Sequence, residues 1–265
     1  MSDGASNPGP NSSNAAESQP CPDASDGYTK AALLVGGQGT RLRSVVSGTP
    51  KPLVRVGRYC FLELLIRQLR HQGIRRIVMC TGYLADQIER EFGDGHTLDV
   101  IIEYSEEKSQ LGTAGAVKLA EAMLSQSSEF LVMNGDSFLD VNFHDLLRFH
   151  REHGGLVSMA VRRVNDAARY GTVDVDERCR VVRFSEKLGR NSPGLVNAGV
   201  CVFSRQVMAH IPQGPASLER DVYPRLIDRG IYACEQSGTF LDIGTPEDYA
   251  RAQEISEQIY AAAFR

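Results

Sequence analysis

The sequence predicts an α/β fold in which a mostly parallel, mixed sheet is flanked by helices. The first indication is the run at residues 31–35, which is apolar at every position, as expected of a parallel strand covered on both faces. The second is the alternation of strand-like and helix-like patterns along the chain up to about residue 153. The third is size, because 265 residues, 42% of them hydrophobic and 23% charged, can fill one large core.

The elements of the first half are delimited by apolar periodicity and by glycine. Apolar residues recur at helical spacing from Phe61 to Leu69, before Gly73. A buried strand at residues 76–81 then ends at Gly82, which completes a β-α-β unit. The pattern continues with a helix over residues 85–91, a strand over 99–103, a helix over 114–123, a strand over 130–134 and a helix over 143–153, capped by Asn142.

The second half has fewer long helices between its strand-like runs, so we expect part of it to be antiparallel. These runs cover residues 156–161, 171–175, 181–185 and 195–203. Residues 218–229 predict an amphipathic helix, and residues 238–242 predict a strand. Thr245 as N-cap, Pro246 at the first helical position and acidic residues in the first turn predict a last helix.

Composition excludes several classes of partner. The formal net charge of −4 and the absence of tryptophan argue against nucleic-acid binding, and no apolar run reaches the ~20 residues that span a bilayer. Six cysteines without a C-x-x-C pair predict reduced thiols in a cytoplasmic protein, with Cys80 and Cys201 buried in strands. His150 and His153 lack a third ligand nearby and predict a solvated helix face rather than a zinc site.

The first 27 residues differ from the rest of the chain. They are rich in Ser, Asn, Gly, Pro and Ala, contain no large aliphatic residue after Met1, and lack the apolar segment of a signal peptide. We therefore expect a disordered tail over residues 1–27 and one domain over residues 28–265.

The glycine-rich stretch after the first strand predicts a binding loop for a polyphosphate. Gly36, Gly37 and Gly39 let the backbone approach a ligand closely and present its N–H groups to phosphate oxygens. Arg41 adds positive charge, and Lys51 is held between two prolines. The stretch has no Gly-Lys pair of a Walker loop, and Leu42 stands where the dinucleotide fingerprint needs its last glycine. A glycine-rich surface turn with incidental basic residues is the alternative interpretation.

Two motifs resemble those of a known family. G-G-x-G-T-R-L followed by P-K-P, and F-L-D-I-G-T-P-E-D-Y near the end of the chain, are similar to the signatures of the sugar-phosphate nucleotidylyltransferases. The resemblance extends from Lys30 to about Ile259 and implies a single Rossmann-like nucleotidyltransferase domain. It is strongest to the D-glycero-α-D-manno-heptose 1-phosphate guanylyltransferases. We expect no β-helix of the kind that some relatives carry, because hexapeptide repeats are absent.

The resemblance implies which residues contact the nucleotide. The turn at residues 111–113 leads into a helix whose free N–H groups suit an anion or the polar edge of a base. Considered without the resemblance, Gly112 is a tight turn and Thr113 an N-cap. The implied nucleotide-binding residues are Leu33, Val35, Gly36, Gly37, Gln38, Gly39, Thr40, Arg41, Gly82, Leu111, Gly112 and Thr113.

Two aspartates are implied as ligands of Mg²⁺. Asp136 follows a strand, at the sheet edge where ligands of open α/β sheets bind. As an isolated Gly-Asp pair it is equally typical of a turn. In the second motif, Asp242 is implied as the other ligand.

The resemblance also implies a pocket for the acceptor sugar. Lys187 would contact the sugar's phosphate, Glu186 and Asn197 its hydroxyls, and Gly171 its ring. Without the resemblance, Glu186 and Lys187 form an ordinary solvated pair. The catalytic group is then Arg41, Lys51, Asp136 and Lys187.

The implied activity is the transfer of GMP from GTP to D-glycero-α-D-manno-heptose 1-phosphate, with release of pyrophosphate. Mannose 1-phosphate guanylyltransferase and glucose 1-phosphate thymidylyl- or uridylyltransferase are alternatives within the family. A non-catalytic regulatory subunit that binds a nucleotide sugar, and an NAD-dependent oxidoreductase, are alternatives outside that activity. The missing last glycine of the fingerprint disfavours the oxidoreductase. We expect small-molecule substrates, and a homo-oligomer is compatible with the sequence.

Overall fold

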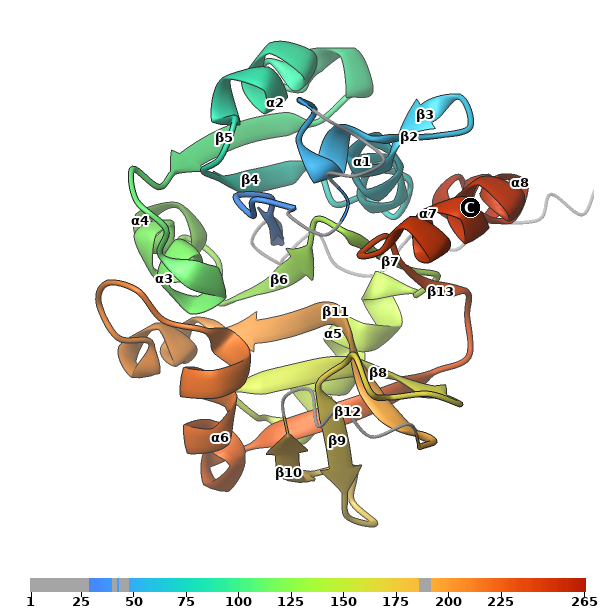
Figure 1. The fold of residues 1–265 in the computed structure, drawn as a ribbon. Helices are drawn as coiled ribbons and strands as arrows, with labels where there is room; N and C mark the ends of the chain where they lie inside the picture. The colour runs from blue at the N-terminus through green and yellow to red at the C-terminus, as the bar shows by residue number, and fades with distance from the viewer. Residues whose placement is uncertain (1–28, 40–41, 43–47, 186–191) are drawn as a thin grey trace, which may run out of the picture.

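The computed structural model describes residues 29–39, 42, 48–185 and 192–265. A nine-stranded sheet runs through the middle of the molecule, with helices on both faces (Figure 1). The predicted tail at residues 1–27 lies outside the described residues, as do Thr40, Arg41, Glu186 and Lys187. None of the described helices is long and apolar enough to cross a membrane.

The N-terminal half of the sheet is parallel and has the order β6-β1-β4-β5. Its strands are β1 (Lys30–Leu34), β4 (Arg76–Thr81), β5 (Ile101–Glu106) and β6 (Glu129–Asn134). Asp99 was predicted to begin a strand, but its left-handed backbone (φ 58°) closes a turn after a short 3₁₀ helix, so β5 begins two residues later. The helices of this half are α1 (Phe61–His71), α2 (Ala85–Phe92), α3 (Gly112–Leu119), α4 (Glu121–Leu124) and α5 (Phe143–His153).

The C-terminal half adds antiparallel pairing. Its strands are β8 (Val157–Val164), β9 (Thr172–Val175), β10 (Val181–Ser185), β11 (Gly194–Ser204) and β12 (Ile231–Gln236). Strand β11 lies antiparallel to β6 and β8, β10 lies antiparallel to β9, and β12 is parallel to β8. Two strands, β10 and β11, therefore oppose the other seven, and the prediction of a mostly parallel mixed sheet is confirmed.

The predicted helix over residues 218–229 is helical along its whole range, but it is not one regular α-helix. The chain forms a π-helical turn at Leu218–Val222, then the short helix α6 (Tyr223–Leu226) and a 3₁₀ turn at Ile227–Arg229. Pro224 supplies the reason, because it has no N–H to continue a helical ladder from the preceding turn.

Strand β11 changes its partner halfway along its length. Its C-terminal part pairs with β6, whereas Val196 pairs with Thr172 of β9. Between the two parts the register shifts, and Gly199 adopts φ 76°. A Cβ at Gly199 would lie 2.9 Å from the side-chain nitrogen of Asn134, at the end of β6. Glycine at this position therefore lets β11 pass close to Asn134 where its pairing changes from β9 to β6.

The core lies on both faces of the sheet. In β1, Ala31 and Leu33 belong to the apolar cluster under α1 and α5, while Ala32 belongs to the cluster under α3 and α6. This explains the continuous apolar run in the sequence, because both faces of the strand are covered.

Small elements complete the fold (Figure 1). Strands β2 (Arg55–Val56) and β3 (Tyr59–Cys60) form a hairpin, and β7 (Ser137–Leu139) pairs with β13 (Phe240–Asp242). Helices α7 (Pro246–Glu254) and α8 (Ser256–Ala263) follow β13, and α8 packs on α1. The predicted caps are confirmed, because the Asn142 side chain accepts from two N–H groups of α5 and that of Thr245 accepts from the N–H of Asp248.

Candidate active site

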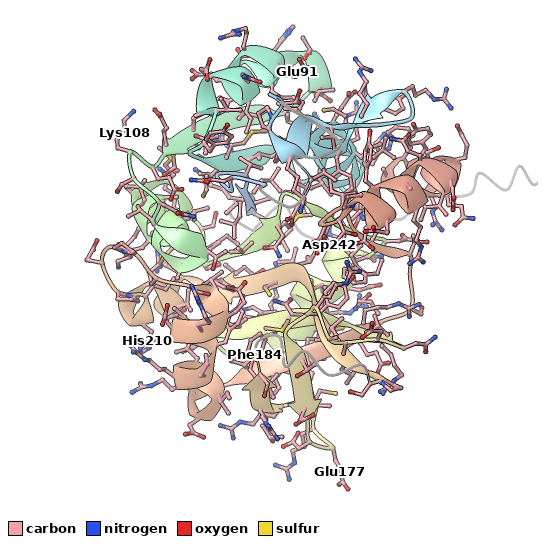
Figure 2. All side chains as sticks on the ribbon, in the orientation of Figure 1. Glu91, Lys108, Glu177, Phe184, His210 and Asp242 are labelled. Atoms are coloured by element: carbon pink, nitrogen blue, oxygen red, sulfur yellow. The ribbon has the colours of Figure 1, made fainter. Side chains whose placement is uncertain are left out.

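One cavity of about 740 Å³ lies at the carboxyl ends of β1, β4 and β6. Ligands of open α/β sheets bind at this edge. Figure 2 shows Asp242 near the middle of the molecule, between the half that carries β4 and β5 and the half that carries β9 and β10. The sequence-predicted residues that line the cavity are Val35, Gly36, Gly37, Gly39, Lys51, Gly112, Thr113, Asp136, Gly171, Asn197 and Asp242.

Four predicted nucleotide-binding residues are not among the residues that line the cavity. Leu33 is fully buried in the core, and its neighbour Leu34 lines the cavity instead, because successive side chains of a strand point to opposite faces. Gly82 does not line the cavity itself, but a Cβ on Gly82 would lie 2.8 Å from the side chain of Glu107, which does. Gln38 and Leu111 flank lining residues without lining the cavity themselves.

The glycine loop approaches Lys51 closely. Gly39 has φ 58°, and a Cβ at this position would lie 2.9 Å from Cβ of Lys51. Only glycine satisfies both the left-handed backbone and this contact. The loop's predicted residues Thr40 and Arg41 are outside the described part of the chain.

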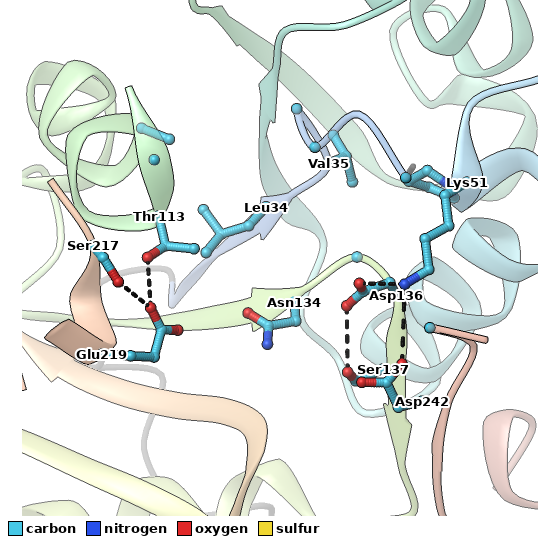
Figure 3. Close-up of a pocket in the computed structure, with 18 of the residues that line it drawn as sticks. Leu34, Val35, Lys51, Thr113, Asn134, Asp136, Ser137, Ser217, Glu219 and Asp242 are labelled. Atoms are coloured by element: carbon cyan, nitrogen blue, oxygen red, sulfur yellow. Dashed lines mark hydrogen bonds and ion pairs between the residues drawn. The ribbon is translucent and has the colours of Figure 1, made fainter. Parts of the chain in front are cut away.

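Lys51 lies between the two predicted aspartates (Figure 3). It belongs to a 3₁₀ turn that contains Pro52, and its side chain is 12% exposed. Its Nζ lies 2.6 Å from Oδ2 of Asp136 and 3.9 Å from Oδ1 of Asp242. One ammonium group thus faces two carboxylates.

The small β7–β13 sheet brings the two aspartates together. Asp242, the last residue of β13, is in register with Ser137, the residue after Asp136. The N–H of Ile243 also donates to the carbonyl oxygen of Asp136, at 3.0 Å. The sheet therefore joins residues that are far apart in the sequence at one point of the cavity wall.

The charge state of Asp242 reflects its surroundings. The pKa of this carboxyl is raised to about 6, mainly by burial and also by the nearby Asp136, against the opposing effect of Lys51. Its buried Oδ1 has no hydrogen bond among the described residues. A buried carboxylate oxygen without a hydrogen bond is costly, so this atom, 3.9 Å from the Lys51 ammonium, is available to a cationic ligand.

The opposite end of the cavity is formed by the turn that begins α3. Gly112 has φ 71°, and a Cβ would lie 2.6 Å from the carbonyl oxygen of Ala216, so this position requires glycine. Thr113 is no N-cap, because its hydroxyl donates to Glu219 Oε2 and accepts from the N–H of Leu218, both at 2.8 Å. It joins α3 to the segment after β11 (Figure 3).

Glu107 lies beside this turn, after the end of β5. Its Oε2 accepts from the N–H of Leu111 at 2.9 Å, and the side chain lines the cavity. Burial raises its pKa, partly offset by that hydrogen bond. Glu107 was not predicted as a site residue, although an acidic residue directly after a strand, five positions before Gly112, was a usable signal.

The described residues that were predicted to bind the acceptor sugar, Gly171 and Asn197, also line the cavity. The N–H of Asn197 donates to the carbonyl oxygen of Gly171 at 3.0 Å, and its side chain accepts from the N–H of Gly199. Glu186 and Lys187 were predicted here and lie outside the described residues. Asn134 and Arg169 also line the cavity, although neither was predicted. The position of Asn134 at the end of a predicted strand was a usable signal.

The chain belongs to the nucleotidyl transferase family, whose model matches residues 30–259. It is 38% identical over 225 residues to mannose-1-phosphate guanylyltransferase of Mycobacterium tuberculosis, which covers 83% of this chain and 62% of that protein. It is 37% identical over 224 residues to the mannose-1-phosphate guanylyltransferase catalytic subunit beta of Drosophila pseudoobscura pseudoobscura, with 83% and 60% covered. The chain thus spans about three-fifths of the length of these relatives.

Solved structures share the fold. HddC from Yersinia pseudotuberculosis, solved in a complex with GMP-PN, superposes with a TM-score of 0.76 at 31% identity and covers 85% of this chain and 98% of HddC. A putative glucose-1-phosphate thymidylyltransferase from Bacillus anthracis reaches a TM-score of 0.78 at 22% identity, with 87% and 98% covered. The second likeness concerns the fold alone.

Proposed function

We propose that this chain transfers GMP from GTP to a sugar 1-phosphate. A phosphate oxygen of the sugar 1-phosphate attacks the α-phosphorus of GTP, the bond from that phosphorus to the bridging oxygen breaks, and pyrophosphate leaves with the electron pair. The observation that carries the proposal is the cavity itself. It has Lys51 and two aspartates at one end, Glu107 at the other, and a glycine loop along its wall.

The attacking oxygen is already ionised, so no general base is needed. Catalysis then depends on aligning two polyanions and on neutralising their charge. In this proposal, Gly36, Gly37 and Gly39 direct N–H groups at the β- and γ-phosphates, and Lys51 holds a phosphate oxygen at the reacting end. Arg41 and Lys187 are proposed to add positive charge on either side.

Asp136 and Asp242 fit a Mg²⁺ ion in this proposal. Magnesium is held by one or two carboxylates together with substrate phosphates and water, and the Oδ1 of Asp242, which accepts no hydrogen bond from the described residues, is such a donor. Among the described residues, no cluster of three or more His, Cys, Asp or Glu side chains could hold a metal, so substrate and water would supply the other ligands. The ion would neutralise charge on the α-phosphate.

We assign the base as guanine because of Glu107. The edge of guanine presents two neighbouring donors, N1–H and the 2-amino group, which suit a carboxylate. Uracil and thymine present one donor between two acceptors, and an acceptor carboxylate beside those oxygens is repulsive. The names of the guanylyltransferase relatives and the GMP-PN bound by HddC agree with this assignment.

The acceptor is a sugar 1-phosphate of the manno configuration. The curated relatives are named for mannose 1-phosphate, whereas the sequence motifs are most similar to those of the heptose guanylyltransferases. The two sugars differ by one hydroxymethylene group, which typically changes binding by only about 1–3 kcal/mol. We propose D-glycero-α-D-manno-heptose 1-phosphate as the preferred acceptor and mannose 1-phosphate as a second one.

We also propose that the reaction takes place in the cytoplasm, where the free thiols of the described cysteines are stable.

The test measures pyrophosphate release with each of GTP, ATP, UTP and dTTP against mannose, heptose and glucose 1-phosphates. We expect GTP with a manno-configured acceptor to be the best pair. A best pair of UTP or dTTP with glucose 1-phosphate would refute the guanine assignment. Tight nucleotide-sugar binding without any release would instead indicate a regulatory subunit.

A further inference from the structure

A bidentate ion pair fastens the acceptor side of the cavity to the start of α7. Arg169 lies in the segment between β8 and β9, two residues before Gly171. Its Nη1 lies 2.7 Å from Oδ2 of Asp248, and its Nη2 lies 3.0 Å from Oδ1. Such fork-to-carboxylate pairs fix orientation as well as distance.

Asp248 is itself held in place. The hydroxyl of Thr245 donates to its Oδ2 at 2.8 Å, and the N–H of Asp248 donates back to that hydroxyl oxygen. Its side chain is 16% exposed, compared with 46% for that of Arg169. Burial alone would raise the pKa of Asp248, but the hydrogen bonds from Arg169 and Thr245 lower it below its ordinary value. The carboxylate is thus a fixed point on α7.

A second contact runs from the same segment to the strand of Asp242. The ring of Tyr170 lies 5.6 Å from that of Phe240, which stands two residues before Asp242 in β13. The guanidinium carbon of Arg169 lies 5.7 Å from the centre of the Tyr170 ring. On its other side, the carbonyl oxygen of Gly171 is bonded to the N–H of Asn197 in β11.

We propose that Arg169 and Asp248 act as one positioning unit, which holds Tyr170 and Gly171 at a fixed distance from the Asp242 end of the cavity. This inference rests on the proposed function, since those two residues would line the acceptor pocket. Affinity for the sugar 1-phosphate then depends on the pair, because loosening it widens the pocket. The nucleotide end, about Glu107 and Gly112, does not depend on it.

The kinetic test uses Arg169→Gln, Asp248→Asn and the double variant. We expect each single variant to raise KM for the sugar 1-phosphate about tenfold, with kcat within about twofold and KM for GTP unchanged, and the double variant to be no worse. Arg169→Lys keeps the charge but loses the fork, so it should behave like Arg169→Gln. If Arg169→Gln is far worse than Asp248→Asn, Arg169 contacts substrate directly and the inference is overturned.

Two matched controls are available. Glu247→Gln removes an exposed carboxylate from the same first turn of α7 without touching the pair. Arg163→Gln breaks a comparable pair with Glu235, whose contacts are 3.2 and 3.3 Å, between β8 and β12. Both should keep wild-type KM values. An equal rise in KM in either control would show that the effect is general destabilisation, and would also overturn the inference.

A readout independent of activity separates this inference from the proposed function. Amide hydrogen exchange over residues 166–173 should be about tenfold faster in Asp248→Asn than in the wild type, and unchanged in Glu247→Gln. Unchanged exchange in Asp248→Asn would overturn the positioning role. If the wild type releases no pyrophosphate, the proposed function fails, and the exchange measurement still decides whether the pair holds the segment.

Discussion

Nζ of Lys51 lies 2.6 Å from Oδ2 of Asp136, across 85 positions of sequence. Lys51 stands between the two prolines after the glycine loop, and Asp136 follows the end of β6, so this contact links the first motif to the edge of the sheet. With Asp242 at 3.9 Å on its other side, the ammonium offsets charge on both carboxylates.

Replacing Lys51 should therefore weaken the hold on a substrate phosphate and also remove the ammonium that faces the two carboxylates. We expect Lys51→Ala to lower kcat/KM by roughly two to three orders of magnitude, comparable with the loss of one preorganised transition-state donor. Lys51→Arg should not restore the rate, because a forked guanidinium is wider than an ammonium. The space is narrow, since Nζ lies 2.6 Å from Asp136 and 3.9 Å from Asp242. Steady-state pyrophosphate release measures both variants. A rate near that of the wild type in Lys51→Ala would remove Lys51 from the reacting end.

The two aspartates should behave as one unit. Asp136→Asn and Asp242→Asn are each expected to abolish Mg²⁺-dependent turnover, and the double variant should be little worse than either single one. Turnover measured across a Mg²⁺ titration tests this. Full activity of Asp242→Asn at low Mg²⁺ would mean that the second ligand has been assigned wrongly. Arg163→Gln, on the outer part of β8, is the control for general loss of folding.

Glu107 should determine selectivity for the 2-amino group of guanine. Inosine triphosphate lacks this group, so the wild type should prefer GTP over ITP by about tenfold to hundredfold, the range for one hydrogen bond to a charged group. In Glu107→Gln, the side-chain oxygen stays on the N–H of Leu111 and the amide nitrogen faces the base, where donor would meet donor. The preference for GTP over ITP should then collapse. An unchanged ratio of kcat/KM values would place the base elsewhere.

The parallel strands near the glycine loop were predictable because they are buried on both faces. The boundaries of β4 and β10 match the predicted ones, and those of β1 and β6 differ by one residue. In contrast, β12 was not predicted, since its alternation of buried and partly buried residues is short and includes the polar pair Glu235 and Gln236. The break between α7 and α8 at Ile255 was also missed, because the apolar spacing continues through it.

The site was predictable where a motif is contiguous. The glycine loop, Lys51 and the two aspartates are found together as the resemblance implies. Glu219 and Arg169 lie outside the motifs and reach the cavity through tertiary packing. Figure 3 shows Glu219 held by Thr113 and Ser217, residues about 100 positions apart. Only the packing of α3 against the segment after β11 produces that arrangement.

His150 departs from the prediction of a solvated helix face. It is 3% exposed, with Nδ1 2.8 Å from Oγ of Ser158 and Nε2 2.9 Å from Oγ of Ser204. The Ser204 hydroxyl donates to the carbonyl oxygen of Gly155, so it accepts from Nε2–H, and Nδ1 accepts from Ser158. The ring is thus held neutral between two hydroxyls.

Because the buried His150 ring is neutral, we predict that the folded protein loses stability in acid. Burial lowers the pKa of His150 from 6.5 to about 4, with a smaller contribution from Arg151. Between those values the unfolded chain binds a proton at this residue and the folded chain does not, so stability is present above about pH 6.5 and is lost as the pH falls toward 4. We expect a loss of roughly 2–3 kcal/mol from pH 7 to pH 4 that is attributable to this residue. Urea unfolding at several pH values measures the slope of the unfolding free energy against pH.

His150→Gln should lower stability at pH 7 but flatten this slope, because neither state then titrates at this position. The substitution His96→Gln, at an exposed histidine, should leave the wild-type slope in place. Equal slopes for the wild type and His150→Gln would show that the acid sensitivity arises from other groups.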